Sequence, residues 1–246
     1  MIAPLAGRRV LVTRAQDDAE RWAARLASLG AIPVILPCLV SEPLDSAPAR
    51  AALRTALHNA AWLVVSSPRG AAIAATLIGV QLPAHVRVAA VGEATAAAAR
   101  THLGRVDLVP ELQTSAGLGE ALARRLTHDG APQLQPVVLA GALGGRGEAE
   151  MSLRTVGAPV TRVDIYRTIP APAASARRDL ARETIHDILL ASPSAVAGLL
   201  NIARVPEGAR VITIGPTTST AARQRGLTVS DEARRPTFEG LLEAMT

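Results

Sequence analysis

Small and hydroxylated residues recur where the apolar segments of this chain end, and residues of these types suit the binding of an anion. Ligands of parallel α/β sheets bind beyond the carboxyl ends of the strands, where free N–H groups of the following helix attract negative charge. A single Ser or Thr there is more simply a helix cap, but the recurrence favours a binding surface. We therefore predict that an anionic substrate contacts Thr13, Arg14, Ser67, Gly92, Thr95, Gly141, Arg146, Ser192, Gly215, Thr217 and Thr218.

The segment 141–147, with the sequence GALGGRG, is one of these turns and is rich in glycine. It follows an apolar run and opens a helix, as a phosphate-binding loop would. It lacks the G-x-G-x-x-G spacing of a dinucleotide site, and only Asp164 offers an acidic partner for a ribose about 20 residues downstream. Arg146 is better suited to grip a carboxylate.

Tyr166 is the only tyrosine of the chain and ends an apolar segment. A phenol at that place can donate a hydrogen bond to a leaving hydroxyl or to a developing charge. It can equally be an aromatic side chain that packs at a hinge. Tyr166 is our candidate catalytic residue, with the packing role as its alternative.

The composition excludes several classes of chemistry. All 26 basic residues are arginine, so a Schiff-base lysine and a Walker A lysine are both absent. A single cysteine and five scattered histidines show no metal-ligand spacing, and we predict no metal site. The net charge of +5 comes with only 2% aromatic residues, which argues against nucleic-acid binding. No apolar run approaches the ~20 residues that span a bilayer, so we expect a cytoplasmic protein with no membrane partner.

The second half of the chain repeats the first. Four landmarks recur in the same order. Thr13 and Gly30 correspond to Ala140 and Gly157, Ser67-Pro68 corresponds to Ser192-Pro193, Gly92 to Gly215, and Gly117 to Gly240. Two copies of one α/β unit usually form a cleft between them.

The elements that must position these residues follow from the apolar patterning. Short apolar runs bounded by Gly, Pro, Ser or Thr are typical of buried parallel strands. We predict strands near 9–13, 32–36, 61–66, 87–91, 105–109, 136–140, 160–166, 187–191, 210–214 and 227–230. Helical spacing predicts helices over 17–29, 70–77, 94–103, 118–126, 148–156, 193–202 and 218–224. This alternation predicts an α/β fold with two similar parallel-sheet domains.

Two proline-punctuated stretches predict crossings between the domains. They lie near 36–48 and 167–175, at matching places in the two repeats, and prolines suit extended linkers. One domain would then comprise 1–38 plus 172–246 and the other 39–168. A two-stranded linker would join them, with a cleft between.

Several short pieces of the chain together match one known family: 9–14 (RVLVTR), 29–31 leading to Pro37, Ser67-Pro68, 91–95 (VGEAT), 163–167 (VDIYR), 214–218 (IGPTT) and 236–241 (PTFEGL). On these pieces the chain resembles the uroporphyrinogen-III synthase family. These pieces cover nearly the whole chain. Ser66 and Ala191 depart from the family, which often has Thr there, and the 140–147 loop is an unusual glycine-rich variant.

The resemblance implies two α/β domains and a cofactor-free lyase. The implied substrate is the linear tetrapyrrole hydroxymethylbilane, which loses water to an azafulvene and closes through a spiro intermediate with inversion of its last ring. Tyr166 is the implied assistant of hydroxyl departure, and Ser67, Thr95 and Thr218 map to cleft positions. Orientation would supply most of the catalysis.

An alternative of a different class is a non-catalytic two-domain protein that binds a tetrapyrrole or another polycarboxylate. It stays open because no residue in the sequence is an obligatory catalyst. A transient contact with the preceding pathway enzyme is left open as well.

Overall fold

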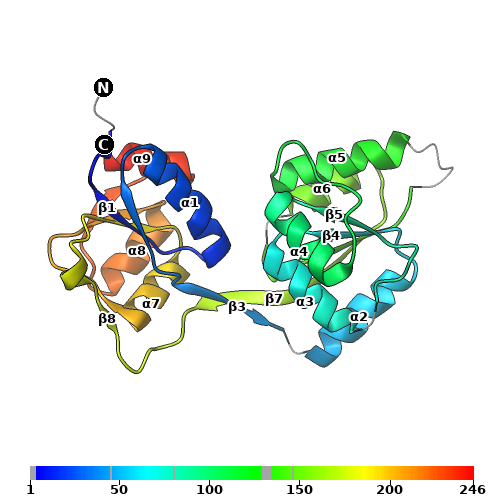
Figure 1. Cartoon of the computed structure of the whole chain (residues 1–246), viewed down its shortest axis with the longest axis horizontal. Helices are drawn as coiled ribbons and strands as arrows, with labels where there is room; N and C mark the ends of the chain where they lie inside the picture. Colours follow the sequence, from blue (N-terminus) through cyan, green and yellow to red (C-terminus); the bar gives the residue numbers. More distant parts are fainter. Residues whose placement is uncertain (1–3, 45, 80, 129–133, 146) are drawn as a thin grey trace. The chain divides into compact units, whose positions relative to one another are not determined.

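The protein consists of two similar units (Figure 1). Its structure is a computed structural model, which describes residues 4–44, 46–79, 81–128, 134–145 and 147–246. Unit 1 comprises Met1–Val40 and Ile169–Thr246, and unit 2 comprises Ser41–Thr168. The chain therefore passes between the units twice, at 40/41 and at 168/169.

Unit 1 is built on a five-stranded sheet in which every described strand pair is parallel. The strand order is β12 (Val229–Glu232), β11 (Arg210–Thr213), β9 (Asp187–Leu190), β1 (Arg9–Val12) and β2 (Ile32–Ile35). Its helices are α1 (Gln16–Ser28), α7 (Pro193–Ile202), α8 (Pro216–Gln224) and α9 (Phe238–Met245). A short pair, β8 (Arg178–Asp179) and β10 (Ala203–Arg204), and the 3-10 turn η1 (Leu180–Glu183) complete it.

Both faces of the unit 1 sheet are buried. Successive residues of a strand point to opposite faces, so neighbours in the sequence pack in different cores. Val10 and Val12 of β1 pack in a core with residues of α1 and α9. Leu11, between them, packs in a second core with residues of α7 and α8. This explains why the strands read as continuous apolar runs in the sequence.

Unit 2 repeats this plan, and its sheet also has five strands. Its sheet has the order β3 (Leu39–Pro43), β7 (Val160–Pro170), β6 (Val137–Ala142), β4 (Trp62–Val65) and β5 (Arg87–Ala90). Helices α2 (Ser46–His58), α3 (Pro68–Ile78) and α4 (Glu93–Leu103) contribute to the core on one face. Helices α5 (Ser115–His128) and α6 (Glu148–Thr155) contribute to the core on the other.

The prediction of a mixed α/β fold with parallel sheets is confirmed. The strand predicted over 105–109 is wrong: the structure has only an isolated bridge between Ala89 and Leu108. At this place the Asp107 carboxylate accepts the Val88 N–H at 2.8 Å, in place of a backbone carbonyl. A side chain has taken one position of the ladder.

Residues 36–48 are also not one extended segment. Strand β3 ends at Pro43 and helix α2 begins at Ser46, with Pro48 in its first turn. Proline is tolerated there because the first N–H groups of a helix have no intrahelical acceptor. Helices α2 and α9 are absent from the elements predicted above.

Candidate functional site

The predicted contact residues are divided between the two units. Unit 2 holds Ser67, Gly92, Thr95, Gly141 and Tyr166, whereas unit 1 holds Thr13, Arg14, Ser192, Gly215, Thr217 and Thr218. Arg146 lies outside the described residues. Most of them follow a strand of their own sheet, at the carboxyl edge where ligands of such sheets bind, whereas Gly141 and Tyr166 lie inside β6 and β7.

Ser67 and Tyr166 of unit 2 are hydrogen-bonded to each other. The Ser67 Oγ lies 3.0 Å from the Tyr166 Oη, and it also accepts the Gly70 N–H at 2.9 Å as the N-cap of α3. The Tyr166 ring packs in the core beneath α3, and the residue is only 7% exposed. The two strongest candidates in unit 2 therefore form one structural feature.

A register shift in β7 places the tyrosine there. Gly141 pairs with Asp164, but Ala142 pairs with Tyr166, so β7 holds one extra residue against β6. Ile165 and Tyr166 are consecutive and yet pack in the same core cluster, which a regular strand would not allow. Such irregularities re-aim side chains and recur beside active sites.

The N-terminus of α4 in unit 2 is already occupied. Gly92 is its N-cap residue, and the Gln113 side chain reaches back so that its Oε1 accepts the Glu93 N–H at 3.1 Å. A Cβ at Gly92 would overlap that amide. Thr95 is buried in the same helix. Sequence reasoning missed Gln113, because its role depends on the fold of a loop 20 residues away.

The N-terminus of α8 in unit 1 is open by contrast. Gly215 is its N-cap residue, no side chain caps it, and a Cβ at Gly215 would meet nothing within 4 Å. Pro216 takes the first helical position, and Thr217 beside it is exposed. The Thr218 side chain is buried. Pro216 has no N–H and the Thr218 N–H donates to the Gly215 carbonyl at 3.0 Å, so Thr217 carries the N–H that this helix start can offer.

The remaining unit 1 candidates are engaged within the unit. The buried Thr13 hydroxyl donates to the Leu189 carbonyl at 2.6 Å. Ser192 caps α7 by accepting the Ala195 N–H at 3.1 Å.

Arg14 pairs with Asp18 and lies 5.6 Å from the Trp22 ring centroid. Burial raises the pKa of Asp18, but the guanidinium groups of Arg14 and Arg21 outweigh burial and leave that pKa below its usual value. The pair with Asp18 uses one Nη atom of Arg14, and the buried Nε has no hydrogen-bond partner among the described residues.

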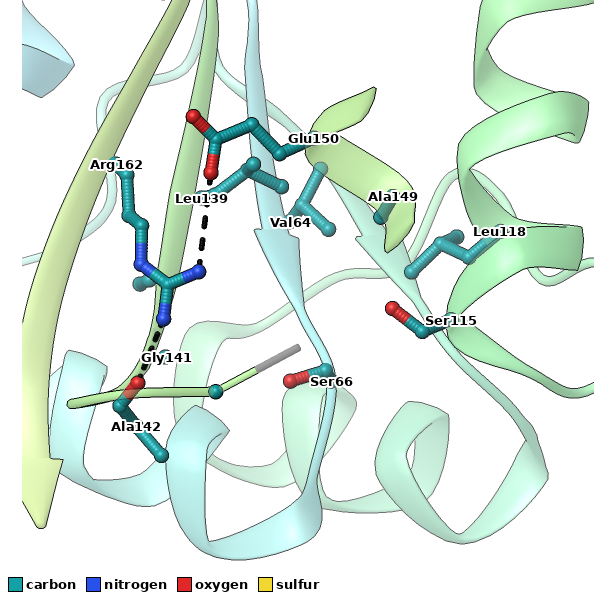
Figure 2. Close-up of a pocket in the computed structure, with 12 residues that line it drawn as sticks. Val64, Ser66, Ser115, Leu118, Leu139, Gly141, Ala142, Ala149, Glu150 and Arg162 are labelled. Carbon is teal, nitrogen blue, oxygen red and sulfur yellow. Dashed lines mark hydrogen bonds and ion pairs between the residues drawn. The ribbon is translucent and has the colours of Figure 1, made fainter. Parts of the chain in front are cut away.

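A pocket of about 80 Å³ lies in unit 2 beside Gly141 (Figure 2). Ser66 and Ser115 face it, and Arg162 borders it. The Arg162 guanidinium donates to the Ala142 carbonyl at 2.8 Å and pairs with Asp164 at 2.9 Å and Glu150 at 3.7 Å. Two carboxylates neutralise this cation, so the pocket has no spare positive charge to attract an anion from Arg162.

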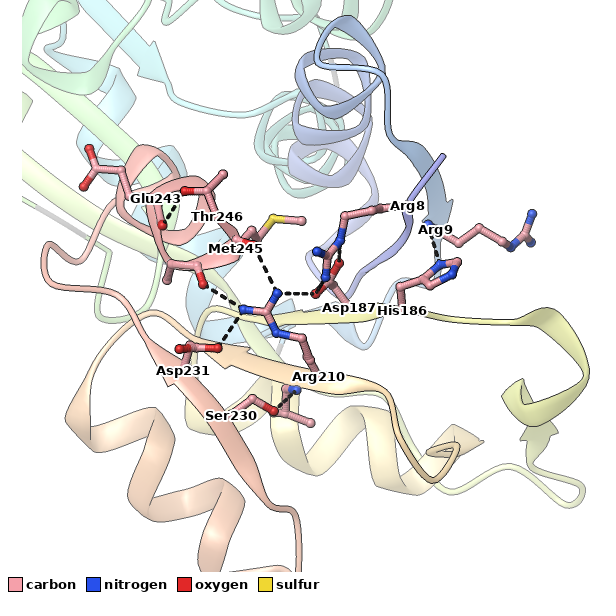
Figure 3. Close-up of polar contacts among 12 residues, drawn as sticks. Arg8, Arg9, His186, Asp187, Arg210, Ser230, Asp231, Glu243, Met245 and Thr246 are labelled. Atoms are coloured by element: carbon pink, nitrogen blue, oxygen red, sulfur yellow. Dashed lines mark hydrogen bonds and ion pairs between the residues drawn. The ribbon is translucent and has the colours of Figure 1, made fainter. Parts of the chain in front are cut away.

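Charges at the opposite, amino edge of the unit 1 sheet form a separate cluster (Figure 3). Asp187, the first residue of β9, is fully buried and accepts from Arg8 at 2.7 and 2.6 Å. Arg210 lies 3.7 Å from the same carboxylate and pairs with Asp231 at 2.7 Å. Because this edge is away from the strand ends that bind ligands, we assign the cluster to stability.

The described residues contain no group of three or more side chains arranged to hold a metal ion. The Cys38 thiol is buried, and burial raises its pKa to about 12, so it is not a reactive nucleophile. Within the same described part of the chain, none of the helices has the length and apolar character to cross a membrane.

Comparison with known proteins gives one consistent family. Residues 20–243 match the family model described as uroporphyrinogen-III synthase HemD. A protein of Synechococcus elongatus named uroporphyrinogen-III synthase is 27% identical over 262 residues, which cover 98% of this chain and 96% of that protein. The porphyrin biosynthesis protein HemD of Ruminiclostridium josui is 25% identical over 92% of this chain, which spans 46% of that longer protein.

Two solved structures are similar at lower identity. A mutant uroporphyrinogen III synthase from Thermus thermophilus is 19% identical, with a TM-score of 0.49 and 97% of each chain covered. Uroporphyrinogen-III synthetase from Helicobacter pylori is 16% identical, with a TM-score of 0.48 and coverage of 96% of this chain and 97% of the other.

Proposed function

We propose, from the premise that this chain belongs to the uroporphyrinogen-III synthase family, that it converts hydroxymethylbilane to uroporphyrinogen III with loss of water. The single observation that carries this function is the family match over residues 20–243. The relative named uroporphyrinogen-III synthase, matched over 98% of this chain, supports it.

We propose that the reaction begins with departure of the terminal hydroxyl. The Tyr166 phenol gives its proton to the oxygen of that hydroxyl, the C–O bond breaks with its electron pair on oxygen, and water leaves. The phenolate then takes the N–H proton of the same pyrrole, which gives the azafulvene and restores the phenol. The last pyrrole attacks through its substituted position, and the spiro intermediate fragments and recloses with that ring inverted. In each closure the azafulvene nitrogen gains one proton and the attacking pyrrole loses one.

The carboxylates of the substrate need donors rather than catalysts. The open start of α8, with Gly215 and the exposed Thr217, supports a role in holding one of them. The +5 net charge attracts a polyanion over longer range. Because the azafulvene can cyclise unaided to the wrong isomer, holding one folded conformer is the main catalytic task.

We further propose that the substrate binds between two domains, 1–38 plus 172–246 and 39–168. The support is that small residues and helix starts follow the strands in both units. A decrease in the radius of gyration on product binding, measured by small-angle scattering, is the expected result. An unchanged radius at saturating product would contradict closure of the two domains on the ligand.

The same chemistry leads us to propose a cytoplasmic enzyme that takes its substrate from the preceding pathway enzyme in a transient contact. Rapid transfer limits unaided closure to the wrong isomer. A shorter lag in the coupled reaction than free diffusion allows is the expected result, and a lag equal to that of free substrate would count against the contact.

The decisive experiment supplies hydroxymethylbilane to the purified protein and identifies the isomer after oxidation to porphyrin. We expect the type III isomer to form far faster than any product in a buffer control. Protein boiled before the assay is the matched control. Formation of the type I porphyrin alone, at the rate of the buffer control, would reject the function.

A further inference from the structure

The Ser67 hydroxyl joins a helix start to the phenol of Tyr166, and the direction of its hydrogen bonds matters for the reaction. Ser67 Oγ accepts the Gly70 N–H at 2.9 Å and lies 3.0 Å from Tyr166 Oη. Among the residues that the structure describes, Ser67 is the one hydrogen-bond partner of that phenol.

A serine hydroxyl has one proton to donate and two lone pairs that accept. One lone pair of Ser67 is engaged by the Gly70 N–H. A hydroxyl that accepts from one donor becomes a stronger donor to its next partner, because hydrogen bonds in a chain polarise one another. Either hydroxyl could donate across the 3.0 Å contact, and this polarisation favours donation from Ser67 to Tyr166 Oη. In that arrangement the phenol proton has no partner among the described residues.

Gly70 supplies the space for this arrangement. A Cβ at Gly70 would lie 2.9 Å from Ser67 Oγ and 3.6 Å from the Cε1 atom of Tyr166. The first of these distances is too short for a real methyl group, so Ser67 Oγ would have to move.

The other repeat shows that the cap itself does not need glycine. Ser192 caps α7 in the same way as Ser67 caps α3, and the residue three positions later is Ala195. No tyrosine packs against that cap in unit 1, and its hydrogen bond is 3.1 Å rather than 2.9 Å. Glycine therefore stands in the repeat that holds the tyrosine, and alanine in the repeat that does not.

We propose that Ser67 is a positioning residue, which donates to Tyr166 Oη and so turns the phenol proton toward the substrate. Only the chemical consequence of this hydrogen bond rests on the proposed function. When the phenol gives its proton to the departing hydroxyl, the Ser67 hydrogen bond stabilises the phenolate that remains. Gly70 keeps Ser67 Oγ at the distance that this requires.

The direction of the hydrogen bond can be measured without turnover, because Tyr166 is the only tyrosine. The two Raman bands of the tyrosine Fermi doublet change their relative intensity according to whether the phenol donates or accepts. The higher-frequency band is the stronger one when the phenol accepts. We expect Ser67→Ala to lower the relative intensity of this band.

The matched control is Ser192→Ala, which removes the equivalent cap in unit 1 and should leave the doublet unchanged. A Ser67→Ala doublet in which the higher-frequency band gains intensity would show that the phenol donates to Ser67, and would overturn the proposal. A doublet that Ser67→Ala leaves unchanged would overturn it as well. Neither result depends on whether the protein makes uroporphyrinogen III.

The kinetic consequence is tested with a double-mutant cycle. A neutral hydrogen bond of this kind corresponds to about a tenfold fall in kcat for Ser67→Ala, with little change in KM. In the Tyr166→Phe background, Ser67→Ala should have no further effect on kcat, and Ser67→Thr should restore most of the activity in the native background. Equal losses in both backgrounds would show that Ser67 does not act through Tyr166. If no variant and no native protein forms the type III isomer, the proposed function fails while the Raman result stands.

Discussion

Units 1 and 2 share their backbone geometry down to single turns but use it for different side chains. Thr114 in unit 2 and Thr237 in unit 1 each accept an N–H at 3.0 Å, from Gly117 and Gly240 respectively. A Cβ at either glycine would overlap the carbonyl five residues earlier. The repeat thus preserves the positions where only a glycine fits, while the residues around them are free to diverge.

The divergence separates two tasks. In unit 2 the start of α4 is closed by Gln113, and the cap of α3 holds Tyr166. In unit 1 the residue that corresponds to Gln113 is Pro236, which has no amide to offer, and the start of α8 is open. Under the proposed function, unit 2 would supply the proton donor and unit 1 would supply the Thr217 N–H for negative charge.

The amino edges of the two sheets differ as well. Trp62 begins β4 and lies against Arg87, whose guanidinium carbon is 4.5 Å from the ring centroid. At the equivalent place in unit 1 the buried Asp187 pairs with Arg8, and Arg210 stands where unit 2 has Arg87. One unit anchors this edge with an aromatic ring and the other with a buried carboxylate.

The largest expected effect is that of Asp187→Ala on unit 1. Removing one partner of a buried ion pair costs about 3–5 kcal/mol, and we expect the lower end because Arg8 and Arg210 are 30% and 35% exposed. The variant is made in a Trp62→Phe background, where Trp22 is the remaining tryptophan and reports unit 1. Urea unfolding followed by its fluorescence gives the free energy.

Trp62→Phe alone should lower the free energy of unfolding of unit 2 by less than half of the loss expected for Asp187→Ala. The cation–π contact contributes about 0.5–1 kcal/mol, and the phenyl ring still fills most of the buried space. A loss below about 1 kcal/mol for Asp187→Ala would mean that the carboxylate is not what anchors unit 1.

Tyr166→Phe should lower kcat by about 100-fold, the lower end for loss of a general acid, which corresponds to about 2.7 kcal/mol. The fold should survive, because the phenyl ring still fills the core. Initial rates of type III formation and a thermal melt measure the two effects. Kinetics indistinguishable from the native enzyme would remove Tyr166 from the mechanism and leave it as a packing residue.

Alanine at Gly92 should lower the stability of unit 2, whereas alanine at Gly215 should raise KM. Gly92→Ala displaces Gln113 and loses its bond to the Glu93 N–H, which costs unit 2 about 1 kcal/mol. Gly215→Ala meets no neighbour and should change stability by less than about 0.5 kcal/mol. Its methyl group would instead obstruct an anion at α8 and raise KM severalfold. If Gly215→Ala leaves KM unchanged, α8 does not bind the substrate.

The last comparison concerns acid stability. Asp107 in unit 2 and Ser230 in unit 1 accept equivalent strand N–H groups, from Val88 at 2.8 Å and from Val211 at 3.2 Å. Burial raises the pKa of Asp107, but its hydrogen bonds from Arg105 and Val88 outweigh burial and hold that pKa below its usual value. A carboxylate of this kind stabilises the fold above its unfolded pKa of about 4. That contribution is lost as the pH falls through the folded value.

Asp107→Asn should therefore cost about 1 kcal/mol at pH 7, a figure kept small because solvent screens the group. The difference from the native protein should shrink below about pH 4. Ser230→Ala should cost no more and be independent of pH. Urea unfolding at several pH values distinguishes them, and a constant difference for Asp107→Asn would assign its role to packing rather than charge.

The sequence predicted the strands and helices around the repeated landmarks well, because buried parallel strands and their glycine turns leave strong local patterns. It failed at two places. The segment 105–109 reads as a strand but forms only a bridge, beside which the Asp107 carboxylate takes the place of a backbone carbonyl. Pro48 reads as part of a linker but sits in the first turn of α2.

By itself the amino-acid sequence determined the α/β class, the duplication and the chemical types available, since these depend on composition and local spacing. Only the tertiary structure decided which of the matched positions are open and which are occupied. Ser67 and Tyr166 are 99 residues apart, and the register shift in β7 that brings the phenol under α3 leaves no local mark. Contacts between distant residues arise from packing, and packing is a property of the folded chain.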